Sequence, residues 1–135
     1  MKGLQNNLQD NINRKRVLIY GAGEAGRQLA DSLENNLEFS VVGFLDNNNQ
    51  LHAQRILGKF IYDLSALENL IQNKDIRIIF LALPGISRSK RNKIIEELKK
   101  YKIIVKTLPS ISEIVDGSIT ISDIKDLKID DLLNR

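Results

Sequence analysis

The chain has 135 residues, of which 42% are hydrophobic and 27% charged, and its formal net charge at pH 7 is +3. These values are typical of one globular domain with its own core, and so small a charge does not by itself indicate a nucleic-acid partner. The absence of cysteine excludes disulfides and thiol chemistry, and a single histidine, His52, excludes a histidine-rich metal site. No apolar run approaches the roughly 20 residues of a membrane helix, and the polar start is unlike a signal peptide. We therefore expect a soluble, cytoplasmic chain without a metal.

Residues 1–15 are rich in Asn and Gln. Leu4, Leu8 and Ile12 have the spacing of a short amphipathic helix. A flexible lead-in fits the composition equally well, and both interpretations stay open. We place the start of the folded domain at residue 16.

A glycine-rich turn follows the first expected strand. Residues 16–19, Arg-Val-Leu-Ile, have the pattern of a buried strand, and a G-x-G-x-x-G motif begins at Gly21. In this setting Gly21 permits the tight turn, Gly23 lets the backbone approach a pyrophosphate, and Gly26 lets the next helix pack on the strand. The free N–H groups at the helix start attract phosphate. The backbone from Ala22 to Ala25 would face the phosphate, and the predicted cofactor-binding residues of the turn are Gly21, Ala22, Gly23, Glu24, Ala25 and Gly26.

The helix and strand after this turn complete the pattern of a dinucleotide site. Residues 40–45 form an expected second strand, and Asp46 at its end lies 20 residues after Gly26, where an acid holds a ribose hydroxyl. No arginine follows Asp46, which favours NAD over NADP. Glu24 suits the helix dipole, but a pyrophosphate would have to share that space with its carboxylate, so either the Glu24 side chain points away or the ligand is not a simple pyrophosphate. The alternative, that the glycines only pack a helix on a strand, stays open. The expected buried face of the helix is Ala25, Leu29, Ala30 and Leu33.

The middle of the chain predicts a third strand and a second helix. Residues 47–49 form a turn cluster, residues 50–57 show no period and are expected to be a loop, and residues 60–62 form a short strand. Ser65 and Glu68 have the spacing of a capping box at the start of the next helix. The expected buried face of that helix is Leu67, Leu70 and Ile71.

Residues 76–83 are almost continuously apolar, which indicates a strand covered on both faces, as in a parallel sheet. A helix capped by Ser87 and a fifth strand at residues 103–105 follow. The alternation of strands and helices predicts a doubly wound, mostly parallel Rossmann-like α/β domain with helices on both faces. We expect Leu83 and Pro84 to line the crevice at the end of the strand.

The start of the helix after Ser87 is a second candidate site. Four cations lie in its first two turns, where they oppose the helix dipole. A bound phosphate or carboxylate would offset that cost, and Ser87, Arg88 and Arg91 are the candidate contacts. The alternative is a solvated basic face. The basic segment from Arg88 to Lys106 contains one aromatic residue, Tyr101. Because it lacks stacking surfaces for bases, we do not expect nucleic-acid binding.

No catalytic group is predicted. A Tyr-x-x-x-Lys pair, in which the lysine lowers the pKa of a catalytic tyrosine, is absent because none of the three tyrosines has a lysine four residues later. His52 lies in a polar segment and is expected to be solvated. We divide the chain into a lead-in at 1–15, a nucleotide-binding domain at 16–110 and a C-terminal extension at 111–135, where residues 118–121 could form an edge strand.

Several segments together resemble a known module. They are residues 16–26 (RVLIYGAGEAG), 42–46 (VGFLD), 82–84 (ALP), 106–110 (KTLPS) and 129–135 (IDDLLNR). The combination is similar to the CoA-binding-like Rossmann domain of membrane nucleoside-diphosphate-sugar epimerases and dehydratases in bacterial polysaccharide and O-antigen biosynthesis. The resemblance covers residues 16–135.

In that family, membrane helices precede this module and a catalytic Rossmann domain with NAD(P) and the Tyr/Lys pair follows it. The Asp-Leu-Leu-x-Arg signature marks the junction, and this chain ends on it. The resemblance therefore implies a non-catalytic domain that binds NAD, CoA or a nucleotide sugar. It also implies contacts with the missing catalytic domain, a possible homodimer, and a place at the cytoplasmic face of the inner membrane through the parent's helices.

Two other functions remain under consideration. One is a ligand-free structural or oligomerisation module of the same enzyme or of a sugar-phosphate transferase. The other is a free-standing oxidoreductase, which the missing Tyr/Lys pair disfavours.

Overall fold

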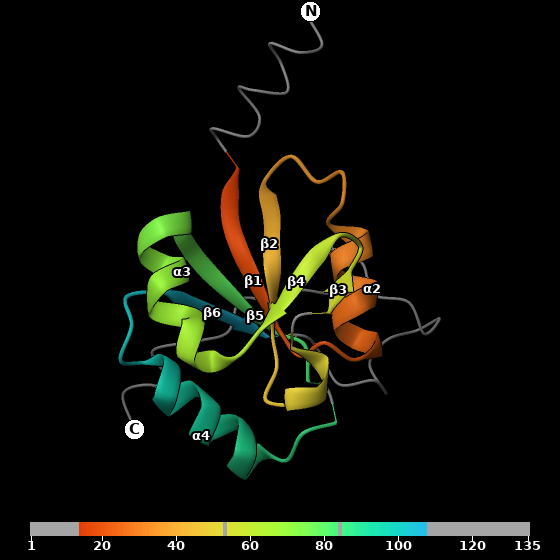
Figure 1. Ribbon diagram of the computed structural model, residues 1–135. Coiled ribbons are helices and arrows are strands. Elements are labelled where there is room, and N and C mark those ends of the chain that lie inside the picture. The colour runs from red at the N-terminus through yellow and green to blue at the C-terminus, as the bar shows by residue number, and fades with distance from the viewer. Residues whose placement is uncertain (1–13, 53, 84, 108–135) are drawn as a thin grey trace, which may run out of the picture.

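The computed structural model describes residues 14–52, 54–83 and 85–107. Its centre is a six-stranded sheet in the order β3-β4-β2-β1-β5-β6 (Figure 1). Neighbouring strands are parallel except β3 and β4, which pair antiparallel. The strands are β1 (Lys15–Tyr20), β2 (Phe39–Leu45), β3 (Arg55–Ile56), β4 (Lys59–Tyr62), β5 (Ile76–Leu81) and β6 (Ile104–Thr107). The helices are α2 (Glu24–Ser32), α3 (Leu67–Lys74) and α4 (Arg88–Leu98), with short 3-10 turns η1 (Asn49–Leu51) and η2 (Leu64–Ala66).

The helices lie on both faces of the sheet, as Figure 1 shows, with α2 on one side and α3 and α4 on the other. This confirms the predicted doubly wound α/β fold. The central strand β1 is buried from Val17 to Tyr20 because both faces are covered. One core includes Val17, Ile19, Leu29, Leu33, Phe44 and Phe80, and the other includes Leu18, Leu45, Leu67, Ile79, Ile95 and Leu98.

The connections reverse direction between β1 and β5. From β1 the chain passes through α2 to β2 on one side, whereas from β4 it passes through α3 to β5 on the other side of β1. Right-handed crossovers then place α2 opposite α3 and α4. The carboxyl ends of β1 and β5 therefore flank a topological switch point, where ligands bind in such sheets.

The predicted loop over residues 50–57 is wrong, because it contains η1 and β3. β3 and β4 form a hairpin whose two turn residues, Leu57 and Gly58, have φ values of 54° and 78°. A two-residue turn with both φ values positive is usually signalled by Asn-Gly or Asp-Gly. Leucine at the first position hides that signal, and a two-residue strand is too short to show a period.

The predicted capping box at Ser65 is also wrong. The carboxylate of Asp63 accepts a hydrogen bond from the Ser65 N–H at 3.0 Å and caps η2, while α3 begins at Leu67 without a side-chain cap. A 3-10 turn inserted before the helix moves its start beyond the serine. By contrast, the predicted cap of α4 is confirmed, since the Ser87 hydroxyl accepts from the Lys90 N–H at 3.2 Å.

Several predictions lie outside the described residues. They concern the helical spacing of residues 1–12, the edge strand at 118–121 and the extension at 111–135. Within the described ranges, no helix has the length and apolar character needed to cross a bilayer.

Replacing Gly26 by alanine should destabilise the fold. A Cβ at this position would overlap the carbonyl oxygen of Gly21, and since that atom is backbone, α2 would have to move away from β1. We expect Gly26→Ala to lower the free energy of unfolding by about 3 kcal/mol, measured by urea denaturation followed by circular dichroism.

Gly23→Ala is the matched control for this substitution. A Cβ on Gly23 would meet nothing within 4 Å, and its φ of −83° suits any residue. We expect a change below about 1 kcal/mol. Equal unfolding midpoints for the two variants would contradict this account of helix–strand packing.

Candidate functional site

The three motif glycines have different structural roles. Gly21 has a φ of 115°, and a Cβ on it would lie 2.7 Å from the carbonyl oxygen of Ala82. Gly26 is required by the contact between α2 and the turn. Gly23 is exposed, has open space around its Cα, and occupies the N-cap position of α2 with no side-chain cap. Packing within the chain therefore explains Gly21 and Gly26 but not Gly23.

Asp46 is bonded directly to the glycine turn. Its Oδ2 accepts a hydrogen bond from the Ala22 N–H at 2.9 Å, and its Oδ1 accepts from the Asn48 N–H at 2.8 Å. A carboxylate offers about four acceptor positions, so Asp46 retains capacity for the hydroxyl groups of a ligand. The two parts of the predicted dinucleotide pattern thus lie in contact at the carboxyl end of the sheet.

His52 is not the solvated residue that the sequence suggested. Its side chain is 22% exposed, and Nε2 lies 2.6 Å from the carbonyl oxygen of Asp46 and 3.9 Å from Oδ1 of Asp63. Because a carbonyl oxygen only accepts, Nε2 carries the proton in this contact. His52 therefore fixes the backbone of Asp46 and connects the ends of β2 and β4. In the described part of the chain, no cluster of side chains could hold a metal ion.

A pocket of about 350 Å³ lies beside Asp46. The ends of β1, β2 and β5 and one face of α4 enclose it, and its size is at the lower end of the range for small-molecule sites. Burial raises the pKa of the Tyr20 phenol above its ordinary value, opposed by a hydrogen bond with Asn47. The lining residues are Tyr20, Asp46, Asn47, Leu83, Ile86, Lys90, Lys93 and Ile94.

The residues predicted to line the crevice and those predicted to bind an anion at the start of α4 do not all lie at the pocket. Leu83 lines the pocket, whereas Pro84 lies outside the described residues. Ser87 uses its hydroxyl to cap α4, and Arg88 is exposed. The Nε atom of Arg91 is buried without a hydrogen-bond partner among the described residues.

The cations that line the pocket are Lys90 and Lys93, which the sequence reasoning missed. A signal for them exists in the sequence. Once Ser87 is taken as the N-cap, Lys90, Lys93 and Ile94 have the i, i+3, i+4 spacing of one helix face. Deciding that this face is turned toward Asp46 requires the position of α4 on the sheet.

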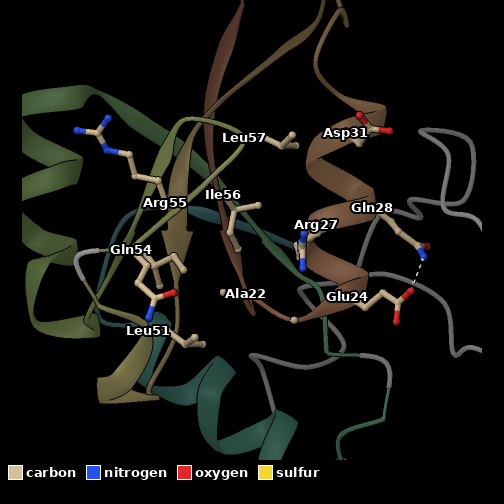
Figure 2. Close-up of a pocket in the computed structure, with 12 residues that line it drawn as sticks. Ala22, Glu24, Arg27, Gln28, Asp31, Leu51, Gln54, Arg55, Ile56 and Leu57 are labelled. Carbon is tan, nitrogen blue, oxygen red and sulfur yellow. Dashed lines mark hydrogen bonds between the residues drawn. The ribbon is translucent and has the colours of Figure 1, made fainter.

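A second cavity, a groove of about 840 Å³, lies between α2 and the β3–β4 hairpin (Figure 2). Ala22 and Gly23 line one end of it. Glu24 and Gln28 of α2 also line this groove, and the Gln28 amide lies 3.4 Å from the Glu24 carboxylate (Figure 2). Glu24 therefore places a carboxylate in the groove next to the helix start. Ala25 packs against the core.

Two comparisons concern proteins or domains of related sequence. A family model described as C2185-like, N-terminal, matches residues 13–72. The crystal structure of UDP-D-quinovosamine 4-dehydrogenase from Vibrio fischeri is 40% identical, with a TM-score of 0.79 over 89% of this chain and 98% of that one. This chain therefore aligns with nearly the whole length of that crystallised chain, in sequence and in fold.

Two other proteins match only in part. The probable polysaccharide biosynthesis protein EpsC of Bacillus subtilis (strain 168) is 27% identical over 95% of this chain, which spans only 23% of the length of EpsC. The crystal structure of RSP in complex with β-NADH is 22% identical, with a TM-score of 0.61 over 88% of this chain and 58% of that one. At that identity RSP shares the fold alone.

The cap at Asp63 should make stability depend on pH. Hydrogen bonds from the Ser65 hydroxyl and N–H hold the pKa of Asp63 below its ordinary value. Because the folded-state pKa is lowered, this contribution is present above about pH 4 and is lost as the pH falls through the folded-state pKa. We expect the difference in urea midpoint between the unmodified chain and Asp63→Ala to be larger at pH 7 than at pH 3.

Asp63→Asn supplies the control, since its amide oxygen can still accept the hydrogen bond but does not titrate. If the difference in urea midpoint between the unmodified chain and Asp63→Ala were the same at pH 7 and pH 3, the charge of the cap would not contribute to stability.

Proposed function

This chain belongs to the family of CoA-binding-like Rossmann domains of nucleoside-diphosphate-sugar epimerases and dehydratases in polysaccharide biosynthesis, and from this premise we propose that it is the nucleotide-binding domain of such an enzyme. Relatives named for polysaccharide biosynthesis and for a UDP-sugar dehydrogenase support the class of the parent protein. The nucleotide would be NAD or a related nucleotide with a diphosphate.

The observation that carries this proposal is that Gly23, at the start of α2, has no packing role that requires a glycine. Among the residues that the structure describes, no contact requires a glycine there, and no side chain caps the first N–H groups of α2. N-cap positions usually hold Ser, Thr, Asp or Asn, whose side chains satisfy those groups. A glycine leaves them open toward solvent, where together with the helix dipole they favour a bound phosphate.

Asp46 and the adjacent pocket would hold the nucleoside. The carboxylate of Asp46 would accept hydrogen bonds from the ribose hydroxyls, which is the role of an acid at the end of the second strand. Leu83, Ile86 and Ile94 offer an apolar lining for the base. Since Asn47 rather than an arginine follows Asp46, an unphosphorylated ribose is favoured, and therefore NAD among the dinucleotides.

We propose binding rather than catalysis for this domain. Tyr20 is the tyrosine beside the proposed ribose site, and its pKa is raised by burial. A tyrosine acting as an acid or base near neutral pH needs the opposite shift, usually from a nearby lysine. The chemical step would then belong to another domain of the parent protein, with this domain sensing a nucleotide. We place the parent at the cytoplasmic face of the inner membrane, with a catalytic domain and a second copy of this chain as partners.

Gly23→Ala tests the proposal by ligand binding. The substituent should leave the fold intact but occupy the space that the diphosphate needs. Thermal-shift and calorimetric titrations with NAD, CoA and UDP should show one ligand that stabilises the unmodified chain, by about 2.7 kcal/mol at a hundredfold excess over Kd. Gly23→Ala should lose this stabilisation.

Absence of stabilisation by any of these ligands would contradict nucleotide binding. It would favour the ligand-free structural or oligomerisation module, with which the packing roles of Gly21 and Gly26 agree. Sedimentation at increasing concentration would then test for a dimer.

A further inference from the structure

The charge of the described residues is concentrated in one segment. Residues 14–86 contain eight Lys or Arg residues and eight Asp or Glu residues, so they are neutral as a group. Residues 87–107, which form α4, β6 and the turn between them, contain eight Lys or Arg residues and two acids, Glu96 and Glu97. The mild net charge of the whole chain therefore conceals a strongly basic segment that ends in the edge strand of the sheet.

Most of these basic side chains are exposed to solvent. Ile95 and Leu98 turn the other side of α4 toward the core, where both are buried. Figure 1 shows α4 at the periphery of the domain. The exposed cations of α4 and of the residues that follow it form what we call the basic surface. Its members are Arg88, Lys90, Lys93, Lys99, Lys100 and Lys102.

The contacts of α4 do not account for the basic surface. Lys99 and Lys100 each lie 3.4 Å from a glutamate one turn earlier. Cations near a helix start oppose the helix dipole, and α4 has no acid in its first turn and no base in its last turn. Its charges are therefore not arranged to stabilise the helix. Within the described ranges, no side-chain hydrogen bond or ion pair is formed by Arg88, Lys90, Lys93 and Lys102.

We propose that the basic surface binds the surface of a membrane that contains anionic lipid. Negatively charged headgroups attract Lys and Arg side chains close to the membrane, and each such side chain strengthens binding by about fivefold. The folded domain would make this contact with its own side chains, so the contact is distinct from attachment through the helices of a parent protein. It goes beyond the proposed nucleotide site and does not depend on it.

The extent and composition of the basic surface favour a bilayer over a small anion or a protein. The 11 residues of α4 rise about 16 Å, so one phosphate group could not contact cations at both ends. Five of the six members are lysines, which are depleted at protein interfaces, and none is aromatic. A fluid layer of anionic headgroups requires no fixed geometry, and therefore suits flexible lysine side chains.

The test is sedimentation of the 135-residue chain with lipid vesicles. One set contains equal parts of phosphatidylcholine and phosphatidylglycerol, and the other contains phosphatidylcholine alone. We expect the anionic vesicles to bind the chain more tightly by on the order of a few hundredfold, because four unpaired cations contribute about fivefold each. Raising the salt concentration from about 0.1 M to about 1 M shortens the Debye length from about 10 Å to about 3 Å and should release the chain.

Arg88→Gln combined with Lys102→Gln removes two members of the basic surface that do not line the pocket beside Asp46. This double variant should bind the anionic vesicles about 25-fold more weakly and keep its unfolding midpoint. Lys15→Gln combined with Lys74→Gln is the matched control, since it removes two exposed cations from outside the basic surface and changes the net charge equally. The control should bind these vesicles as the unmodified chain does.

Three results would overturn the proposal. The first is equal binding of the unmodified chain to the two kinds of vesicle. The second is equal weakening by the two double variants, which would show that net charge rather than the basic surface drives binding. The third is tighter binding of a DNA duplex than of anionic vesicles through Arg88 and Lys102, which would indicate a nucleic-acid partner. None of these measurements includes a nucleotide ligand, so each result leaves the proposed nucleotide site to its own test.

Discussion

The hydrogen bond from the Ala22 N–H to the carboxylate of Asp46, 2.9 Å long, joins the glycine turn to the end of β2, and the geometry of the candidate site depends on it. His52 holds the other side of Asp46 through its carbonyl oxygen. Gly21 lets the turn lie against Ala82 at the end of β5. Three strand ends are therefore held together around one carboxylate, and a ligand would meet a preformed surface rather than a loose loop.

This arrangement divides the carboxyl edge of the sheet into two cavities. The pocket beside Asp46 opens between the strand ends and α4, and the groove beside Gly23 opens between α2 and the hairpin. The glycine turn lies at their boundary, since Ala22 lines the groove while its N–H bonds to Asp46 of the pocket. A nucleotide with its diphosphate at the turn would have one of these cavities on either side of it.

The glycine motif shows why its sequence supports a fold more strongly than a ligand. Gly21 and Gly26 are required whether or not a nucleotide binds, because Cβ atoms there would strike backbone atoms. A domain that had lost its ligand would have to keep both. Of the three motif glycines, Gly23 is free of that constraint in the part of the chain that the structure describes.

The sequence by itself determined the doubly wound sheet, the Ser87 cap and the joint position of Asp46 and the glycine turn, because buried strands and caps leave local patterns. Tertiary structure decided the rest. The hairpin was hidden by Leu57, whose backbone conformation is favoured by glycine and asparagine. The role of His52 and the direction of Lys90 and Lys93 depend on how separate elements pack, and no local pattern records that. The groove follows from a helix that the β2–β4 connection lacks, so it appears only when the elements are assembled.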